Sequence, residues 1–240
     1  LEPLLLTPGP LTTSKSVKEA MLHDWGSRDI SFIEMTERVR NGIEKIAGVE
    51  GNIDNRTCIL LQGSGTFAME AAITSLVPRD GKVLAIVNGA YGHRICKICA
   101  YHNRTFTSYE TEENMPPSLV DLASLLEKDT DISDVAVVHC ETTSGILNPI
   151  SEISEVVTTL GRRLIIDAMS SFGAIPLDVI DPCNCTIVGS SNKCLEGVPG
   201  IGFVIVGSPV FDNAFTKRKQ LSKKINNKLN ILFITANISG

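Results

Sequence analysis

The feature that most constrains this chain is a regular alternation of short apolar runs with helical stretches. Runs of strand length occur at residues 58–61, 82–87, 134–139, 163–166, 185–188 and 203–206. Helical periodicity lies around them, at about residues 32–47, 67–76, 93–101, 119–128 and 150–160. Apolar strands separated by helices are typical of an α/β fold, with a mostly parallel sheet and helices on both faces. In such a fold the ligand-binding residues gather at the carboxyl ends of the strands.

Three regions differ in their pattern. Residues 1–31 form an N-terminal segment in which Ser14 is placed to cap a helix at 15–23. Residues 32–208 contain the alternating pattern and form the predicted large domain. The first helix of this domain has an apolar face made of Ile33, Thr36, Val39, Ile43 and Ile46. In residues 209–240 there are six Lys or Arg residues against one acid and no strand–helix pattern, so we expect an atypical basic tail rather than a native small domain.

Composition argues against several classes of protein. A net charge of −5 over 240 residues does not suit a nucleic-acid-binding protein, and no apolar stretch reaches membrane-spanning length. Seven cysteines, an odd number, favour a reducing compartment over a disulfide framework. The histidines form no HExxH pattern and the closely spaced cysteines lack a second ligand pair, so no metal site is predicted. We expect a cytoplasmic protein, with a mitochondrial location left open.

A glycine-rich turn follows the first predicted strand. Residues 62–66 read Gln-Gly-Ser-Gly-Thr and lead into the helix at 67–76. Glycines let backbone N–H groups approach an anion, the helix N-terminus adds positive potential, and Ser64 and Thr66 add hydroxyl donors. The turn lacks the Gly-Lys-Ser/Thr of a Walker loop and the third glycine of a dinucleotide fingerprint. The sequence therefore indicates a phosphate cradle or, alternatively, only a tight strand–helix turn.

An aspartate and a lysine follow two later strands. Asp167 ends the apolar run at 163–166, and Lys193 lies 26 residues further along, in a loop rich in small residues. A buried carboxylate at a strand end requires a cation, and a protonated pyridine nitrogen is such a cation. A lysine amine holds the aldehyde of pyridoxal 5'-phosphate (PLP) as a Schiff base. The two residues therefore suit PLP, while a capping aspartate and a solvated lysine are the alternatives.

Two more strand ends carry groups that suit a flat ligand. Tyr91 follows the strand at 82–87 and lies between two glycines, which lets its ring stack on a ligand; a loop aromatic packed on the core is the alternative. Thr142 follows the strand at 134–139 and is suited to hydrogen-bond a ring oxygen, although clusters of Ser and Thr usually form turns. Neither residue alone identifies a ligand.

The chain order of these groups is phosphate loop, aromatic ring, hydroxyl, aspartate and lysine. This order resembles the class V aminotransferase family of fold-type I PLP enzymes. The resemblance covers about residues 4–206 and is carried by segments 4–13, 61–65, 88–92, 141–149, 167–173 and 191–200. It implies that PLP is the cofactor and that the large domain binds it.

The resemblance also implies a role for each matching residue. Lys193 would be the Schiff-base lysine and the proton shuttle, and Asp167 would pair with the pyridinium nitrogen. The other implied cofactor contacts are Ser64, Gly65, Thr66 and Asn192 for the phosphate, Tyr91 for stacking and Thr142 for the ring hydroxyl.

Within the family, the motifs are most similar to members that move the amino group of 2-aminoethylphosphonate to pyruvate. The products would be phosphonoacetaldehyde and L-alanine, in phosphonate degradation. Arg28 would then help to recognise an anionic substrate group, with a plain surface arginine as the alternative. A transaminase of the alanine–glyoxylate or serine–pyruvate type is the alternative activity.

The end of the chain departs from the family pattern. Family members continue past the lysine loop into a small C-terminal domain with an arginine for the substrate carboxylate. They form homodimers in which the partner subunit adds phosphate contacts. Because residues 209–240 match none of this, we expect the small domain to be missing. An inactive, truncated PLP-binding fragment is therefore a further alternative.

Overall fold

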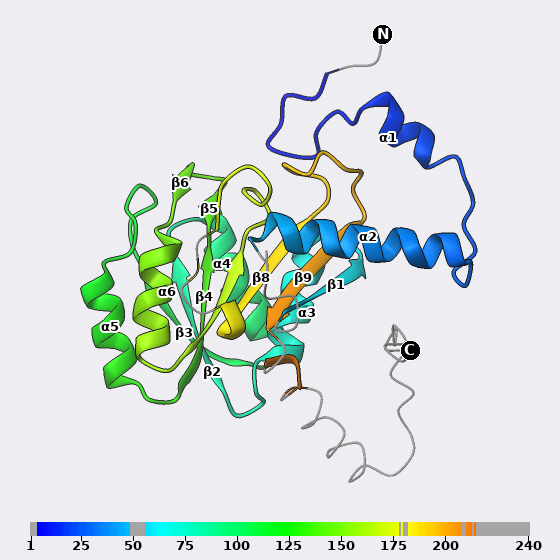
Figure 1. Ribbon diagram of the computed structural model, residues 1–240. Coiled ribbons are helices and arrows are strands. Elements are labelled where there is room, and N and C mark those ends of the chain that lie inside the picture. Colours follow the sequence, from blue (N-terminus) through cyan, green and yellow to red (C-terminus); the bar gives the residue numbers. More distant parts are fainter. Residues whose placement is uncertain are drawn as a thin grey trace.

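The computed structural model describes residues 4–48, 56–177, 179, 182–207, 210–212 and 214 (Figure 1). Its helices are α1 (Lys15–Ala20), α2 (Ile30–Ile46), α3 (Gly65–Leu76), α4 (Ala90–Tyr101), α5 (Leu119–Lys128) and α6 (Ile150–Thr159). The strands of the central sheet are β1 (Arg56–Gln62), β2 (Lys82–Val87), β3 (Thr105–Glu110), β4 (Ile132–Val138), β7 (Arg163–Asp167), β8 (Cys185–Ser190) and β9 (Ile201–Gly207). A short pair, β5 (Cys140–Glu141) and β6 (Ile146–Leu147), and the 3₁₀ helix η2 (Pro182–Asn184) complete the described elements.

The central sheet is mostly parallel, and its strands follow the order β1-β9-β8-β7-β4-β2-β3. The pairs β2–β3, β2–β4, β4–β7 and β7–β8 are parallel. Strand β9 is antiparallel to both of its neighbours, so β1 runs in the same direction as β8. The carboxyl ends of β1, β2, β4, β7 and β8 therefore meet at one edge of the sheet. The predicted α/β class is confirmed.

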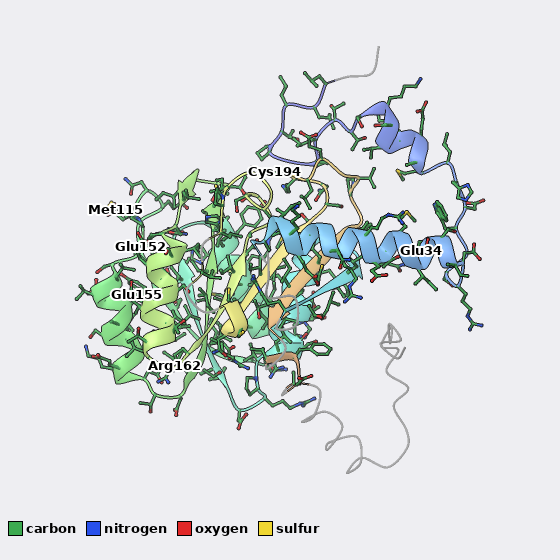
Figure 2. The ribbon with its side chains drawn as sticks, viewed as in Figure 1. Glu34, Met115, Glu152, Glu155, Arg162 and Cys194 are labelled. Carbon is green, nitrogen blue, oxygen red and sulfur yellow. The ribbon has the colours of Figure 1, made fainter. Side chains whose placement is uncertain are left out.

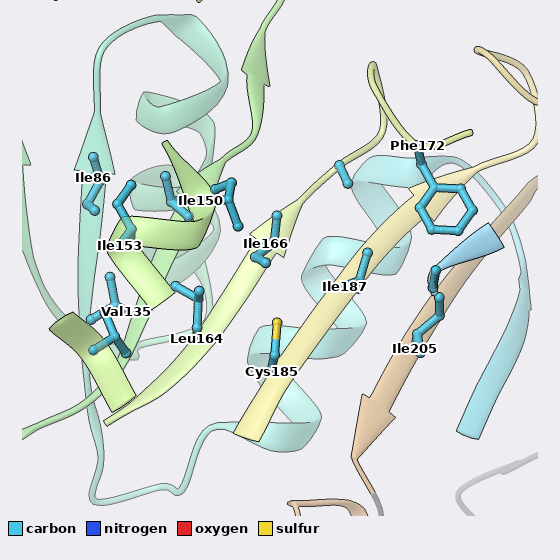
Figure 3. Close-up of a cluster of buried hydrophobic side chains, with 14 of the residues drawn as sticks. Ile86, Val135, Ile150, Ile153, Leu164, Ile166, Phe172, Cys185, Ile187 and Ile205 are labelled. Carbon is cyan, nitrogen blue, oxygen red and sulfur yellow. The ribbon is translucent and has the colours of Figure 1, made fainter. Parts of the chain in front are cut away.

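Helices cover both faces of the sheet (Figure 1). Side chains of α2, α5 and α6 belong to one buried cluster, and those of α3 and α4 belong to the other. Strand β4 shows why two layers form: Val135 and Val137 point to the first cluster, whereas Ala136 and Val138 point to the second. Figure 3 shows Ile153 of α6 over the first of these faces. Burying a Val, Leu or Ile side chain contributes about 1.5–3 kcal/mol, so each aliphatic residue in these two layers stabilises the domain.

Only part of the predicted apolar face of helix α2 is buried. Ile43 is buried, but Ile33 is 54% exposed and Val39 is 45% exposed. Polar side chains attach the helix instead: Arg40 Nε donates to the carbonyl oxygen of Cys58 at 2.9 Å, and Glu44 Oε1 accepts from the Cys58 amide at 2.8 Å. Strand β1 is an edge strand, and these bonds satisfy backbone groups that no neighbouring strand can reach.

Two other boundaries differ from the sequence prediction. Strand β3 was not predicted, because its sequence is polar and it lies at the sheet edge, paired only with β2. Helix α4 begins at Ala90 rather than at residue 93, so Tyr91 lies in its first turn instead of a loop. Ser14 does cap α1, where its hydroxyl accepts from the Val17 amide, although this helix ends at Ala20 rather than at residue 23.

Candidate active site

A cavity of about 370 Å³ opens at the edge of the sheet where the carboxyl ends of the strands meet. Eight of the residues singled out in the sequence line it together: Ser64, Gly65, Thr66, Tyr91, Thr142, Asp167, Asn192 and Lys193. They come from five separate strand ends, and the chain topology brings them into contact with one space. Arg28 lies elsewhere: it is exposed in the segment between α1 and α2 and does not line this cavity.

The first wall of the cavity is the N-terminus of α3. Ser64 caps this helix by accepting from the Phe67 amide at 3.2 Å, which leaves its hydroxyl proton able to donate. Gly65 has no room for a side chain, since an added Cβ would collide with the sulfur of Met169. Gly63, Ser64, Gly65 and Thr66 all line the cavity, so the N-terminus of α3 borders it, and a helix N-terminus suits an anion.

Asp167 is the acid of the site. It is 5% exposed, and its Oδ1 accepts from the Met169 amide at 3.1 Å. Burial raises the pKa of Asp167 to about 6; the Met169 hydrogen bond opposes this shift, Glu141 adds to it, and Arg94 and Lys193 oppose it. No ion pair in the described part of the chain includes Asp167. A buried carboxyl that faces a cavity without a paired cation is suited to a cationic ligand atom.

Lys193 reaches the same cavity from the connection between β8 and β9. Its Nζ donates to the carbonyl oxygen of Gly9 at 3.4 Å, so the N-terminal segment lies against the lysine. Gly9 has a φ of +151°, and an added Cβ would collide with Cδ of Lys193. This close approach requires glycine at that position. Figure 2 labels the next residue, Cys194, whose thiol donates to the Ser170 carbonyl oxygen at 3.3 Å.

Arg94 also lines the cavity, although it was not among the residues predicted from the sequence. Its guanidinium carbon lies 4.6 Å from the centre of the Tyr91 ring, and its Nη1 donates to Oγ1 of Thr66 at 3.2 Å. Arg94 therefore connects the aromatic ring to the helix end that suits an anion. Its position three residues after Tyr91, one turn along a helix, was the available signal. That signal was hidden because the helix was predicted to begin after Tyr91.

The loop after β7 supplies two more lining residues that were not predicted, Met169 and Ser170. Ser170 Oγ donates to the carbonyl oxygen of Cys140 at 2.6 Å, which ties this loop to β5. Next to it, Ser171 Oγ lies 2.8 Å from Nδ1 of His139, and both residues are buried. Burial lowers the pKa of His139, so this imidazole is neutral near pH 7.

The described residues contain neither a metal site nor a membrane-spanning helix. They contain no group of three or more His, Cys, Asp or Glu side chains that could hold a metal ion. Their helices are also too short or too polar to cross a bilayer.

Comparisons with known proteins identify the family of this chain. The model of the aminotransferase class-V family matches residues 17–236. A 2-aminoethylphosphonate–pyruvate transaminase from Pseudomonas aeruginosa (strain UCBPP-PA14) is 54% identical over 210 residues, which is 88% of this chain and 56% of that protein. The chain thus spans little more than half the length of this relative. The predicted tail at 209–240 lies almost wholly outside the described residues, so this tail and the predicted domain boundary at residue 208 stay predictions.

Solved structures give the same result. The alanine–glyoxylate aminotransferase from Nostoc sp. superimposes with a TM-score of 0.79 at 26% identity, over 91% of this chain and 58% of that one. The pyridoxamine–pyruvate aminotransferase from Mesorhizobium loti superimposes with a TM-score of 0.78 at 26% identity, over 89% of this chain and 53% of that one. On the family match and the site geometry together, this chain belongs to the class V aminotransferase family.

Proposed function

We propose that the chain is the cofactor-binding part of a PLP-dependent transaminase that moves the amino group of 2-aminoethylphosphonate to pyruvate. The products would be phosphonoacetaldehyde and L-alanine, so the amino group and the carbonyl oxygen exchange places and no oxidant is required. One observation carries the proposal: a buried carboxyl, a lysine amine and an open helix N-terminus border one cavity of suitable size. The choice of substrates is supported by the relative from Pseudomonas aeruginosa.

The residues present fit PLP. Ser64, Gly65 and Thr66 would hold its phosphate at the α3 N-terminus, with assistance from Asn192, which also lines the cavity. Asp167 would face the ring nitrogen, and the raised pKa of its carboxyl is consistent with a site that requires a cation there. Tyr91 would stack on the ring, and Thr142 would donate to the ring oxygen.

When bound, PLP supplies an aldehyde that takes up amines covalently and a ring that withdraws electrons from the substrate carbon. Asp167 would keep the ring nitrogen protonated, which would strengthen that withdrawal. Lys193 would hold the cofactor through Nζ. The same Nζ would move a proton between the substrate carbon and the cofactor. The Gly9 carbonyl oxygen, which accepts from this amine at 3.4 Å, would help to hold it in place.

The test is an absorbance measurement on the purified 240-residue chain with added PLP. We expect a visible band that borohydride removes, with the label on the peptide that contains Lys193. Lys193→Ala should remove the band and lower any turnover by about 10²–10⁴-fold, whereas the exposed-lysine control Lys128→Ala should leave both unchanged. Absence of the band from the unaltered chain would refute the proposal.

A second assay distinguishes the alternatives. Alanine formation from 2-aminoethylphosphonate and pyruvate is compared with the same assay using serine, and with alanine as donor to glyoxylate. Preference for the phosphonate supports the proposed substrates, whereas equal or greater use of serine or alanine supports the alanine–glyoxylate or serine–pyruvate type. A band without turnover on any donor supports a PLP-binding fragment that is inactive by itself.

We also propose that the protein acts as a homodimer. The support is a set of exposed apolar side chains on the N-terminal segment, after the end of α1 and on helix α2, namely Leu4, Leu6, Leu22, Ile30, Ile33 and Val39. Exposed apolar groups gathered on neighbouring elements are typical of a surface that another chain covers.

A further inference from the structure

The first turn of helix α4 has no cap of its own. The residue before the helix is Gly89, which has no side chain to accept a hydrogen bond. The first hydrogen bond within the helix runs from the His93 amide to the Gly89 carbonyl oxygen. The amides of Ala90, Tyr91 and Gly92 therefore need acceptors from outside the helix.

Glu141 and Thr143, which are distant in sequence, supply these acceptors. Glu141 Oε2 accepts from the Tyr91 amide at 3.1 Å and from the Gly92 amide at 3.2 Å. Thr143 Oγ1 accepts from the Ala90 amide at 3.2 Å and donates to Glu141 Oε1 at 2.9 Å. All three free amides of the first turn are thus bound by the β5 strand and the turn that follows it.

The Glu141 carboxylate is completely buried but does not line the cavity. An added Cβ at Gly89 would collide with its Cγ, so the start of α4 is packed directly onto this side chain. A buried carboxylate at the positive end of a helix is a stabilising arrangement, and it resists displacement because moving it would leave charged and polar groups unpaired. The contact therefore fixes where α4 begins relative to β5.

The residues fixed in this way are the ones that border the cavity. Tyr91 is bound through its own amide, and Arg94 follows one turn later and lies over the Tyr91 ring. Arg94 in turn donates to Thr66 at the α3 N-terminus. A shift of the first turn of α4 would move both the ring and the guanidinium away from the other lining residues.

We propose that Glu141 is a positioning residue of the cofactor site, whose carboxylate caps α4 and thereby sets Tyr91, and with it Arg94, against the cavity. This inference rests on the proposed function, because it assumes that Tyr91 contacts PLP. Glu141 itself does not touch the ligand. The charge of Glu141 also raises the pKa of Asp167, although burial is the larger cause. One buried carboxylate therefore influences both the start of α4 and Asp167.

A double-variant cycle on PLP affinity tests the inference in the full 240-residue chain. The dissociation constant of PLP is measured for the unaltered chain, Glu141→Gln, Tyr91→Ala and the double variant. Glu141→Gln replaces one of the two acceptor oxygens by an NH₂ group, which is a donor and cannot accept from the N–H groups at the start of the helix. We expect it to weaken PLP binding about tenfold, as for the loss of a hydrogen bond to a charged group.

In the Tyr91→Ala background, the same Glu141→Gln change should weaken binding by no more than about threefold, because the residue that it positions is already gone. The exposed glutamate Glu155 on the outer face of α6 provides the matched control, and Glu155→Gln should leave PLP affinity unchanged (Figure 2). An equal loss in both backgrounds would show that Glu141 acts through other residues, and the inference would be wrong.

A measurement without cofactor covers the case in which Glu141→Gln impairs folding. Amide hydrogen exchange at Tyr91 and Gly92 is followed in the apoprotein of Glu141→Gln and of the milder Thr143→Val. Exchange at these amides should become faster while exchange in α6 stays the same. Unchanged exchange at α4, or equally faster exchange in α6, would overturn the inference. If the unaltered chain does not bind PLP at all, the proposed function fails; if it binds and the effects are additive, only the role of Glu141 fails.

Discussion

Asp167 and Lys193 reach one cavity from neighbouring strands, and burial makes the aspartate unusual. Desolvation raises its pKa because a charge in an apolar surrounding loses its hydration. Nothing in the immediate surroundings compensates fully: the Met169 amide supplies one hydrogen bond, and Arg94 and Lys193 act only as nearby charges. At the scale of single residues, the site is therefore built at a cost in stability, as is common where a protein prepares to bind a ligand.

This cost predicts the pH dependence of stability. Folding raises the pKa of Asp167 from 3.8 to about 6. Between these two pH values the folded chain therefore keeps a proton on this carboxyl that the unfolded chain has lost. The stability from this group is present in full below pH 3.8 and is lost as the pH rises through 6. Asp167→Asn keeps the acceptor for Met169 and removes the charge. At pH 7.5 the cofactor-free variant should be about 2–3 kcal/mol more stable than the unaltered chain, and at pH 3.5 nearly equal to it.

Urea unfolding of both chains at the two pH values measures this difference. PLP affinity should change in the opposite direction, because the variant offers no anion to the ring nitrogen. A variant that is less stable than the unaltered chain at pH 7.5 would contradict the assigned cause of the pKa shift.

At the scale of elements, polar side chains join neighbours that apolar packing alone would leave unspecified. Arg40 and Glu44 attach α2 to the edge strand β1. At the other end of the sheet from the cavity, Arg163 of β7 pairs with Asp134 of β4 in register, with 2.6 Å between Nη2 and Oδ2. The Asp134 carboxyl is buried, and burial raises its pKa although Arg163 and Ser133 oppose this.

Removing the arginine should therefore leave a buried carboxylate without its partner. Arg163→Met is expected to lower the free energy of unfolding at pH 7 by about 3–5 kcal/mol, the usual cost of breaking a buried pair from one side. Combining it with Asp134→Asn should recover most of the loss, because no charge then remains to be compensated. Urea unfolding measures both variants. Since the pair lies far from the cavity edge, PLP affinity should stay unchanged; a loss of less than 1 kcal/mol would contradict the role given to this pair.

At the scale of the whole molecule, the exposed apolar surface of α2 predicts association. Ile33→Glu combined with Val39→Glu places two charges on this surface without altering a buried side chain. If the protein is a homodimer through this face, the double variant should shift the molar mass seen by light scattering from two chains to one. Glu152→Gln, on α6 (Figure 2), is the control and should leave the mass unchanged. A single-chain mass for the unaltered protein would refute the proposed dimer in this form.

The alternating pattern was enough to predict the class of fold and the positions of most strands and helices. The pattern did not predict features that depend on neighbouring elements rather than on the local sequence. Strand β3 is polar because one of its edges is open, and the apolar face of α2 gave no warning that Arg40 and Glu44 would attach the helix. The antiparallel direction of β9 is likewise absent from a pattern that records only which residues are apolar.

For the site, the sequence by itself determined which chemical groups follow which strands: the small and hydroxyl residues at Ser64, the carboxyl at Asp167 and the amine at Lys193. Their common cavity, the approach of Gly9 to the lysine and the capping of α4 by Glu141 were decided only by the tertiary structure. The physical reason is that side-chain chemistry and periodicity are local properties. Burial, a raised pKa and contacts between segments 50 or more residues apart arise only when the sheet closes and water is excluded.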